Sequence, residues 1–215
     1  MTAMGIDMRH TIRWVMLAAL VAATVSCGDV SRQGSSPVYL VIDTLTATRG
    51  GGTGSTASST LVSDVITNVT TPAPCTPTTP CPTIFGDNGT VTLRAPLKNI
   101  GAGTALTPTT NNEVTITRVH VQYIRADGRN VEGVDVPYAF DGAATGTIPA
   151  GGTLTIGFVL VRNVAKQESP LAQLRTSPNI ITSIANVTFY GADRTGNAIS
   201  VTGQISISFG NFGDF

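Results

Sequence analysis

The longest strictly alternating run in the chain is Ile199-Ser200-Val201-Thr202-Gly203-Gln204-Ile205-Ser206-Ile207-Ser208-Phe209. Its apolar residues and Gly203 share one face of an extended strand, because successive side chains of a β-strand point to opposite faces. The turn sequence Asp193-Arg194-Thr195-Gly196-Asn197 comes before it, and an apolar run at 184–190 comes before the turn. This pattern predicts a β-hairpin with one buried face.

Shorter runs of β-branched and aromatic residues recur upstream of the hairpin, separated by turns rich in Gly, Pro and Thr. We expect further strands at residues 37–42, 61–69, 91–95, 114–123, 131–136 and 154–160. A phase change near Thr117-Arg118 predicts a β-bulge, and Asp127-Gly128 predicts a tight turn. Ser169-Pro170 is typical of a helix start, which predicts one short helical turn over residues 171–174.

Seven to nine short strands without long helical periodicity predict an all-β fold, an antiparallel β-sandwich. Over residues 37–210 the strand rhythm resembles the immunoglobulin-like and fibronectin-like domains of bacterial surface proteins. The Cys…Trp…Cys signature of true immunoglobulin domains is absent, because Trp14 is the chain's one Trp. A small closed β-barrel is the alternative fold.

The N-terminus has the pattern of an export signal. Arg9 and Arg13 precede an apolar run at 14–25, which is too short to span a bilayer and ends in Ser26-Cys27. This junction resembles the lipobox of bacterial lipoproteins, in which the cysteine is lipidated and becomes the new N-terminus. The resemblance implies a signal peptide at 1–26, starting from Met1 or Met8, and a lipid on Cys27.

The expected organisation after the signal is a flexible tether at 27–36 and a single β-sandwich domain at 37–215. By the same resemblance, Gly28 directly after the lipidated cysteine favours the outer membrane over the inner one in a Gram-negative cell. The partner expected at the N-terminus is therefore the membrane, reached through the lipid. An ordinary secretory signal, and hence a secreted protein, is the alternative.

Cys75 and Cys81 stand in a Pro/Thr-rich stretch at 70–90. An exported chain with two cysteines left over favours a disulfide between them. Closing this seven-residue loop removes about 2.4 kcal/mol of conformational freedom from the unfolded chain in the chain-entropy model. We therefore predict a bridge that fastens this loop.

Composition and motifs argue against several function classes. The chain has 13 Lys+Arg and 13 Asp+Glu, so it lacks the basic surplus that nucleic acid demands. His120 lies in an apolar strand pattern, and no nucleophile elbow or nucleotide loop is present. We predict a non-enzymatic protein without a cofactor. Asp87, Asp193 and Asn197 lie in predicted turns and are the calcium candidates, but the chemistry of tight turns is the favoured explanation for them, so no metal site is predicted.

The expected function is that of an interaction, adhesion or assembly module on the cell envelope. A sheet edge can bind a protein partner or a second copy without special side chains. The candidate contacts are the first strand, Val38, Tyr39, Leu40, Val41 and Ile42, and the terminal aromatics Phe212 and Phe215. Two alternatives stand beside it: a filament subunit that donates residues 38–42, and a carbohydrate or small-ligand binder using Tyr39, Tyr123, Tyr138 and Tyr190.

The lipid anchor gives a first prediction. Cys27→Ser should abolish palmitate labelling and move the protein from the membrane fraction to the soluble one, because acyl chains hold a lipoprotein in the bilayer. Labelling in cells followed by fractionation measures both effects, and Cys75→Ser serves as the control that keeps the label. A wild-type protein that takes up no label would instead be a secreted one.

Overall fold

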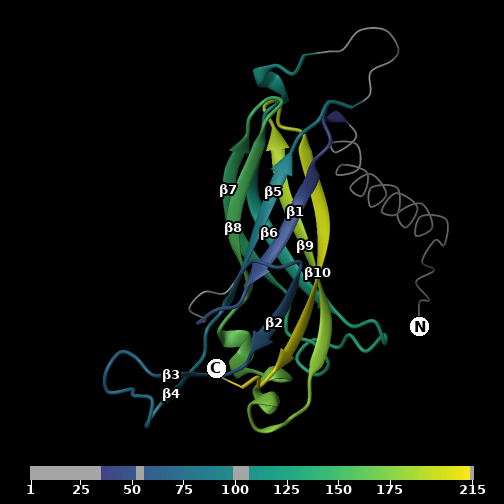
Figure 1. Ribbon diagram of the computed structural model, residues 1–215. Helices are drawn as coiled ribbons and strands as arrows, with labels where there is room; N and C mark the ends of the chain where they lie inside the picture. The colour runs from purple at the N-terminus through teal and green to yellow at the C-terminus, as the bar shows by residue number, and fades with distance from the viewer. Residues whose placement is uncertain (1–34, 52–55, 99–106, 214–215) are drawn as a thin grey trace, which may run out of the picture.

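The computed structural model describes residues 35–51, 56–98 and 107–213, and these form two facing β-sheets (Figure 1). The smaller sheet has the order β1-β5-β8, and the larger one has the order β2-β10-β9-β6-β7. The strands of the smaller sheet are β1 (Val41–Thr48), β5 (Asp87–Arg94) and β8 (Thr153–Val161). Those of the larger sheet are β2 (Thr60–Asp64), β6 (Val114–Ile124), β7 (Phe140–Ile148), β9 (Ile181–Asp193) and β10 (Ala198–Gly210).

The all-β sandwich expected from the sequence is confirmed, and the alternating run at 199–209 forms most of β10. Ile205, Ile207 and Phe209 are buried, and β10 pairs with β9 from Ala198 to Phe209. The bulge is confirmed as well, because the pairing of β6 with both neighbours shifts between Ile116 and Arg118. The ladders of the described residues form separate sheets, which favours the sandwich over the closed barrel.

Several element boundaries differ from the expectation. The segment at 61–69 is divided between β2 and the short strand β3 (Thr67–Val69), which pairs with β4 (Cys81–Thr83) beside the disulfide. β2 runs parallel to β10, so the sandwich is not wholly antiparallel. Alternation within one strand carries no information about the direction of its neighbour, and this feature therefore lay beyond sequence reasoning.

Residues 131–136 form no strand. They are a loop with a single bridge between Glu132 and Val136, and the chain reaches β7 only at Phe140. The turn at Asp127-Gly128 is present, with Gly128 at φ +81° and its N–H donating to the Arg125 carbonyl. Asp127 binds Arg125 and Arg129 locally, which holds this loop in a conformation of its own instead of a hairpin.

The helical content is three 3₁₀ turns instead of one helical turn: η1 (Thr110–Asn112), η2 (Val164–Gln167) and η3 (Leu171–Thr176). η3 covers the predicted segment, but Pro170 is its N-cap and Ser169 lies before it. The buried Leu171 and Leu174 hold η3 against the core, so tertiary packing stabilises a turn too short to persist alone.

The core lies between the two sheets and contains two aromatic pairs, of which the first joins the sheets and the second lies within the large sheet. Phe158 of β8 meets Phe189 of β9 edge to face, with ring centroids 5.2 Å apart. Gly89 of β5 leaves the space for the Phe158 ring, because a Cβ there would lie 2.2 Å from it. Tyr123 and Phe209 make a second edge-to-face pair at 6.1 Å.

The Phe158–Phe189 contact gives a prediction about stability. Phe189→Ala should lower the free energy of unfolding by about 3–5 kcal/mol, because it leaves a cavity between the sheets. Tyr190→Ala is the matched control. Tyr190 follows Phe189 on β9 but faces outwards under Arg118, so the loss of its ring should cost about 1 kcal/mol. Urea unfolding followed by circular dichroism measures both, and equal losses would contradict this account of the core.

Candidate functional site

The two ends of the sandwich differ, and the register defines them. Val114, the first residue of β6, pairs with Asp193, whereas Ile124, the last residue of β6, pairs with Ile184. We call the end at Asp193 the proximal end and the end at Ile124 the distal end. The described chain begins at the proximal end, with Ser35 and Ser36 (Figure 1).

Ser36 belongs to the fold, although the tether was expected to extend to it. Its side chain is 1% exposed and donates a hydrogen bond to Asp193 in the turn between β9 and β10. Val38 follows, fully buried, and bridges Leu97 beyond the end of β5. The chain is thus fixed at the proximal end. The predicted signal peptide, Cys27 and the rest of the tether lie outside the described residues.

The expected first strand begins later than predicted. Val38, Tyr39 and Leu40 precede β1, which starts at Val41 and continues through Ile42 to Thr48. Val38 and Leu40 are buried in the core, and Tyr39 is 54% exposed. β1 is the terminal strand of its sheet.

The free side of β1 carries features that discourage pairing with another chain. Its pairing with β5 is irregular between Ile42 and Thr44, and Asp43 at that position binds Arg94 at 2.5 Å. Near the other end of β1, Ala47 exchanges two backbone hydrogen bonds with Ser58. Bulges, charges and covering segments are common protections of edge strands.

The calcium candidates do not meet, because Asp193 and Asn197 lie at the proximal end and Asp87 at the distal end. The Asp193 carboxylate accepts hydrogen bonds from the backbone and side chain of Thr195 and from the backbone and side chain of Asn197. Burial alone would raise the pKa of Asp193, but these hydrogen bonds lower it to about 2. The described residues contain no group of three His, Cys, Asp or Glu side chains placed to hold a metal ion.

Asp87 is the first residue of β5 and not a turn residue. It is fully buried, and its Oδ2 lies 2.9 Å from the Nζ of Lys166 on η2, which is also buried. The Ser63 hydroxyl donates to the same Oδ2 at 2.6 Å, and the Gly50 backbone N–H donates to Oδ1 at 2.9 Å. Asp87 therefore connects β2, the segment after β1, and η2.

A second acid and a second base complete this buried cluster. Asp64, the last residue of β2, is 2% exposed, lies 3.8 Å from Arg49, and accepts backbone hydrogen bonds from Ile66 and Phe212. Burial lowers the pKa of Lys166, and the charges of Asp87 and Asp64 oppose that effect. Burial and the charge of Asp87 also raise the pKa of Tyr123, whose hydroxyl donates to the Leu160 carbonyl at 2.7 Å.

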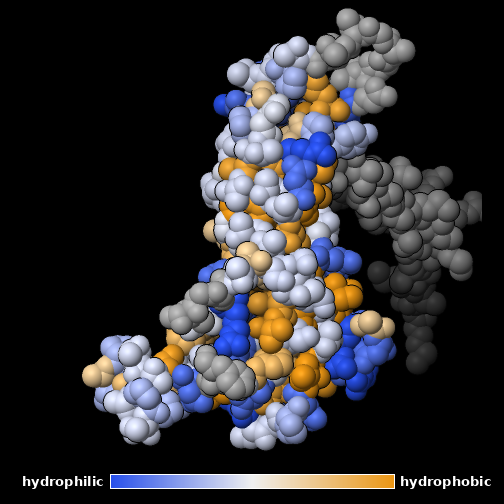
Figure 2. Space-filling model, in the orientation of Figure 1, coloured by the Kyte–Doolittle hydropathy of each residue, from blue (hydrophilic) through white to orange (hydrophobic). Residues whose placement is uncertain are grey.

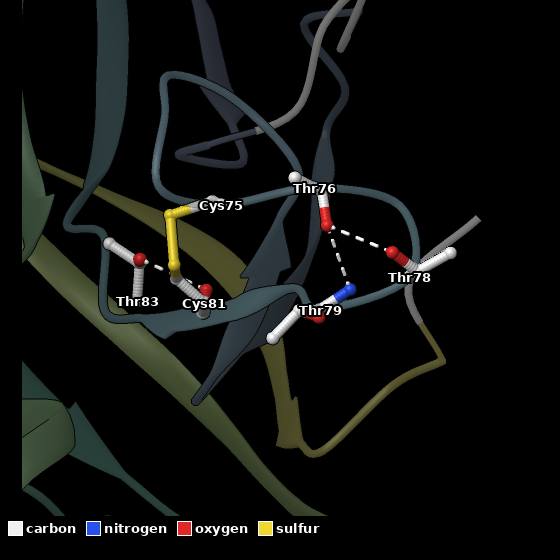
Figure 3. The surroundings of a disulfide bond; sticks show 6 residues. All are labelled: Cys75, Thr76, Thr78, Thr79, Cys81 and Thr83. Carbon is white, nitrogen blue, oxygen red and sulfur yellow. Dashed lines mark hydrogen bonds between the residues drawn. A yellow bond between two sulfur atoms is a disulfide. The ribbon is translucent and has the colours of Figure 1, made fainter.

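The disulfide between Cys75 and Cys81 is confirmed, with Cα atoms 5.3 Å apart (Figure 3). Within the loop that it closes, the Thr76 hydroxyl accepts a hydrogen bond from the Thr79 backbone N–H and lies 3.1 Å from the Thr78 hydroxyl. β3 and β4 run on either side of the bridge, so the loop projects as a short arm near the distal end (Figure 1).

Exposed hydrophobic side chains gather at the distal end. Of the eight large ones among the described residues, only Tyr39 lies at the proximal end. The other seven are Val62, Val131, Val134, Tyr138, Val159, Val164 and Ile180. Figure 2 shows hydrophobic surface among hydrophilic residues in the lower part of the molecule, and also along its middle and upper parts. The uneven distribution of the large exposed side chains could not be read from the sequence, because it depends on which loops the topology brings to one end.

The outer face of the large sheet is polar, and side chains on neighbouring strands form hydrogen bonds with one another there. The hydroxyl oxygens of Thr188 and Thr202 are 2.8 Å apart, and the Gln204 side-chain amide donates a hydrogen bond to Oδ1 of Asn186 at 2.9 Å. His120 is half-buried on this face and lies 3.2 Å from Asp141.

The remaining candidates divide between core and surface. Tyr123 is buried and therefore not available as a carbohydrate platform, and the Arg118 guanidinium lies 4.0 Å from the ring centroid of Tyr190. Phe212 is half-buried, with its ring over Gly210 at the end of β10. Phe215 lies outside the described residues. No described helix is long and apolar enough to cross a membrane.

These features define an all-β sandwich with a buried ionic cluster at one end. No protein-family model matches the chain, and no curated protein matches it either. One solved structure with similarity is the X-ray structure of Northeast Structural Genomics Consortium target SoR45, which is 14% identical. The similarity covers 59% of this chain and 72% of that one at a TM-score of 0.31, a level that carries no argument.

The hydrogen bonds to Asp193 give a prediction about acid stability. A carboxyl whose folded pKa is depressed stabilises the fold above its ordinary pKa of 3.8, and this contribution is lost as pH falls towards about 2. Asp193→Asn should therefore be less stable than wild type at neutral pH and lose less stability between about pH 4 and 2. Urea unfolding across this range tests it, with Asp135→Asn in the exposed distal loop as the control. Parallel curves for wild type and Asp193→Asn would refute the prediction.

Proposed function

We propose that the protein is a lipid-anchored β-sandwich of the bacterial cell envelope that acts, without catalysis, as an interaction, adhesion or assembly module. The sequence supports the anchor, through the signal pattern that ends at Cys27. An outer-membrane location follows from the residue after that cysteine, with secretion as the alternative.

The difference between the proximal and distal ends of the sandwich is the observation that carries the proposal. Ser36 is fixed at the proximal end, so a lipid nine residues before it would hold that end near the membrane. The distal end would then face away from the membrane. Seven of the eight large exposed hydrophobic side chains among the described residues lie at this end, so it offers a partner more apolar contact than the proximal end does.

The distal loop at 125–139 is the part best suited to contact a partner. Val131 and Val134 are 59% and 65% exposed, and Tyr138 combines an apolar ring with a polar hydroxyl. Ion pairs of Asp127 with Arg125 and Arg129 hold the base of the loop in place. A loop ordered before binding loses less conformational entropy when it binds.

The two alternatives have less support. Donation of residues 38–42 to a neighbour would remove Val38 and Leu40 from the core, and β1 carries the protections described above. A carbohydrate platform would rely on exposed aromatic rings, and of its four tyrosines only Tyr39 and Tyr138, at opposite ends, are exposed.

Site-specific photo-crosslinking in living cells tests the proposal. A benzoyl-phenylalanine at position 134, in place of Val134, should form a protein–protein adduct on irradiation, because this residue is 65% exposed in the distal loop. The same group in place of Tyr39, which is 54% exposed but proximal, is the matched control and should form none. Adducts at both positions, or at neither, would argue against a distal interaction site.

A further inference from the structure

Lys166 and Asp87 are placed as two reactants held in contact. Nζ of Lys166 and Oδ2 of Asp87 are 2.9 Å apart, and the two side chains are 1% and 0% exposed. They come from η2 and from the start of β5, which lie far apart in the sequence and are brought together by the fold. Groups held at such a distance react with effective concentrations that free reactants never reach.

The hydrogen bonds on Asp87 suit an attack on its carboxyl carbon. The Gly50 N–H donates to Oδ1, where negative charge would gather as the amine adds. A fixed backbone donor stabilises such a developing oxyanion without reorganisation. The Ser63 hydroxyl donates to Oδ2, the oxygen that would depart.

The contact itself allows the first proton transfer, because Nζ of Lys166 lies 2.9 Å from Oδ2 of Asp87. Burial disfavours the ammonium form and lowers the pKa of Lys166, which favours the neutral amine required for attack. The buried pair therefore contains an amine, a carboxyl group to accept it and a direct path for the proton between them.

We propose that Lys166 and Asp87 are joined in the folded protein by an isopeptide bond. Within the contact, Nζ of Lys166 gives a proton to Oδ2 of Asp87, which leaves a neutral amine beside a neutral carboxyl group. Nζ then attacks the carboxyl carbon, forming the C–N bond while the carbonyl electron pair moves to Oδ1. A second proton passes from nitrogen to Oδ2, and the C–Oδ2 bond breaks as the electron pair returns from Oδ1. Oδ2 leaves as water with two protons that came from the ammonium group, and the amide nitrogen keeps the third. No oxidant, reductant or co-reactant is needed.

The surroundings favour the product. Two buried charges become one neutral amide, which removes the cost of keeping an ammonium and a carboxylate out of water. Asp64 keeps its charge and its neighbour Arg49. The bond would connect β5 to η2 and fix the segment that carries Val164 at the distal end.

Tryptic peptide mapping of the wild-type chain tests the bond. Trypsin cuts after Arg49, Arg94, Arg162 and Arg175, and it would also cut after a free Lys166. We expect the fragments 50–94 and 163–175 as one linked species, lighter than their sum by one water and uncut at Lys166. Lys166→Arg is the matched variant: it keeps the charge and should give separate fragments.

The outcomes are distinct. Fragments 163–166 and 167–175 from folded wild type, with no linked species, would overturn the proposal and leave an ion pair. A water lost without linkage, as from an aspartyl succinimide, would overturn it too. If Lys166→Arg fails to fold, the wild-type map alone decides.

Discussion

The contact between Asp87 and Lys166 is the constraint on which the distal half of the structure depends. A buried charge costs several kcal/mol unless a partner and further hydrogen bonds compensate it. Lys166 therefore stays inside only while Asp87 stands at the start of β5, and Asp87 in turn needs Ser63 of β2 and the backbone of Gly50. The carbonyl of Lys166 accepts a hydrogen bond from Arg175, which brings η3 into the same assembly.

That cluster also explains how one end of the sandwich can expose apolar loops and remain ordered. Ser63 belongs to the large sheet and Asp87 to the small one, so the polar contact joins the two layers where the aromatic core ends. Tyr123 adds a second connection between the sheets through the Leu160 carbonyl. The proximal end is closed differently, by the hydrogen-bonded turn at Asp193 and by Ser36.

Sequence reasoning succeeded where a local pattern has a single structural consequence. Alternation at 199–209 indicates a strand with one buried face, and the phase change at Thr117-Arg118 indicates a bulge. Cys75 and Cys81 lie six residues apart in a chain with the pattern of an export signal, which predicts that they pair. It failed at 131–136, where apolar residues alternate imperfectly and local ion pairs of Asp127 hold a loop. It failed again at Asp87-Asn88-Gly89, because residues typical of turns also occur where a strand begins beside a buried partner.

The sequence by itself determined the all-β class, the longest hairpin and the disulfide loop, since each follows from spacing along the chain. Only the tertiary structure decided that β2 runs parallel to β10, that Val38 and Leu40 are core residues, and that the exposed hydrophobic side chains collect at one end. It alone revealed the partner of Lys166. A single lysine in a polar segment reads as a surface residue, and 79 positions separate it from Asp87, so no local pattern could join them.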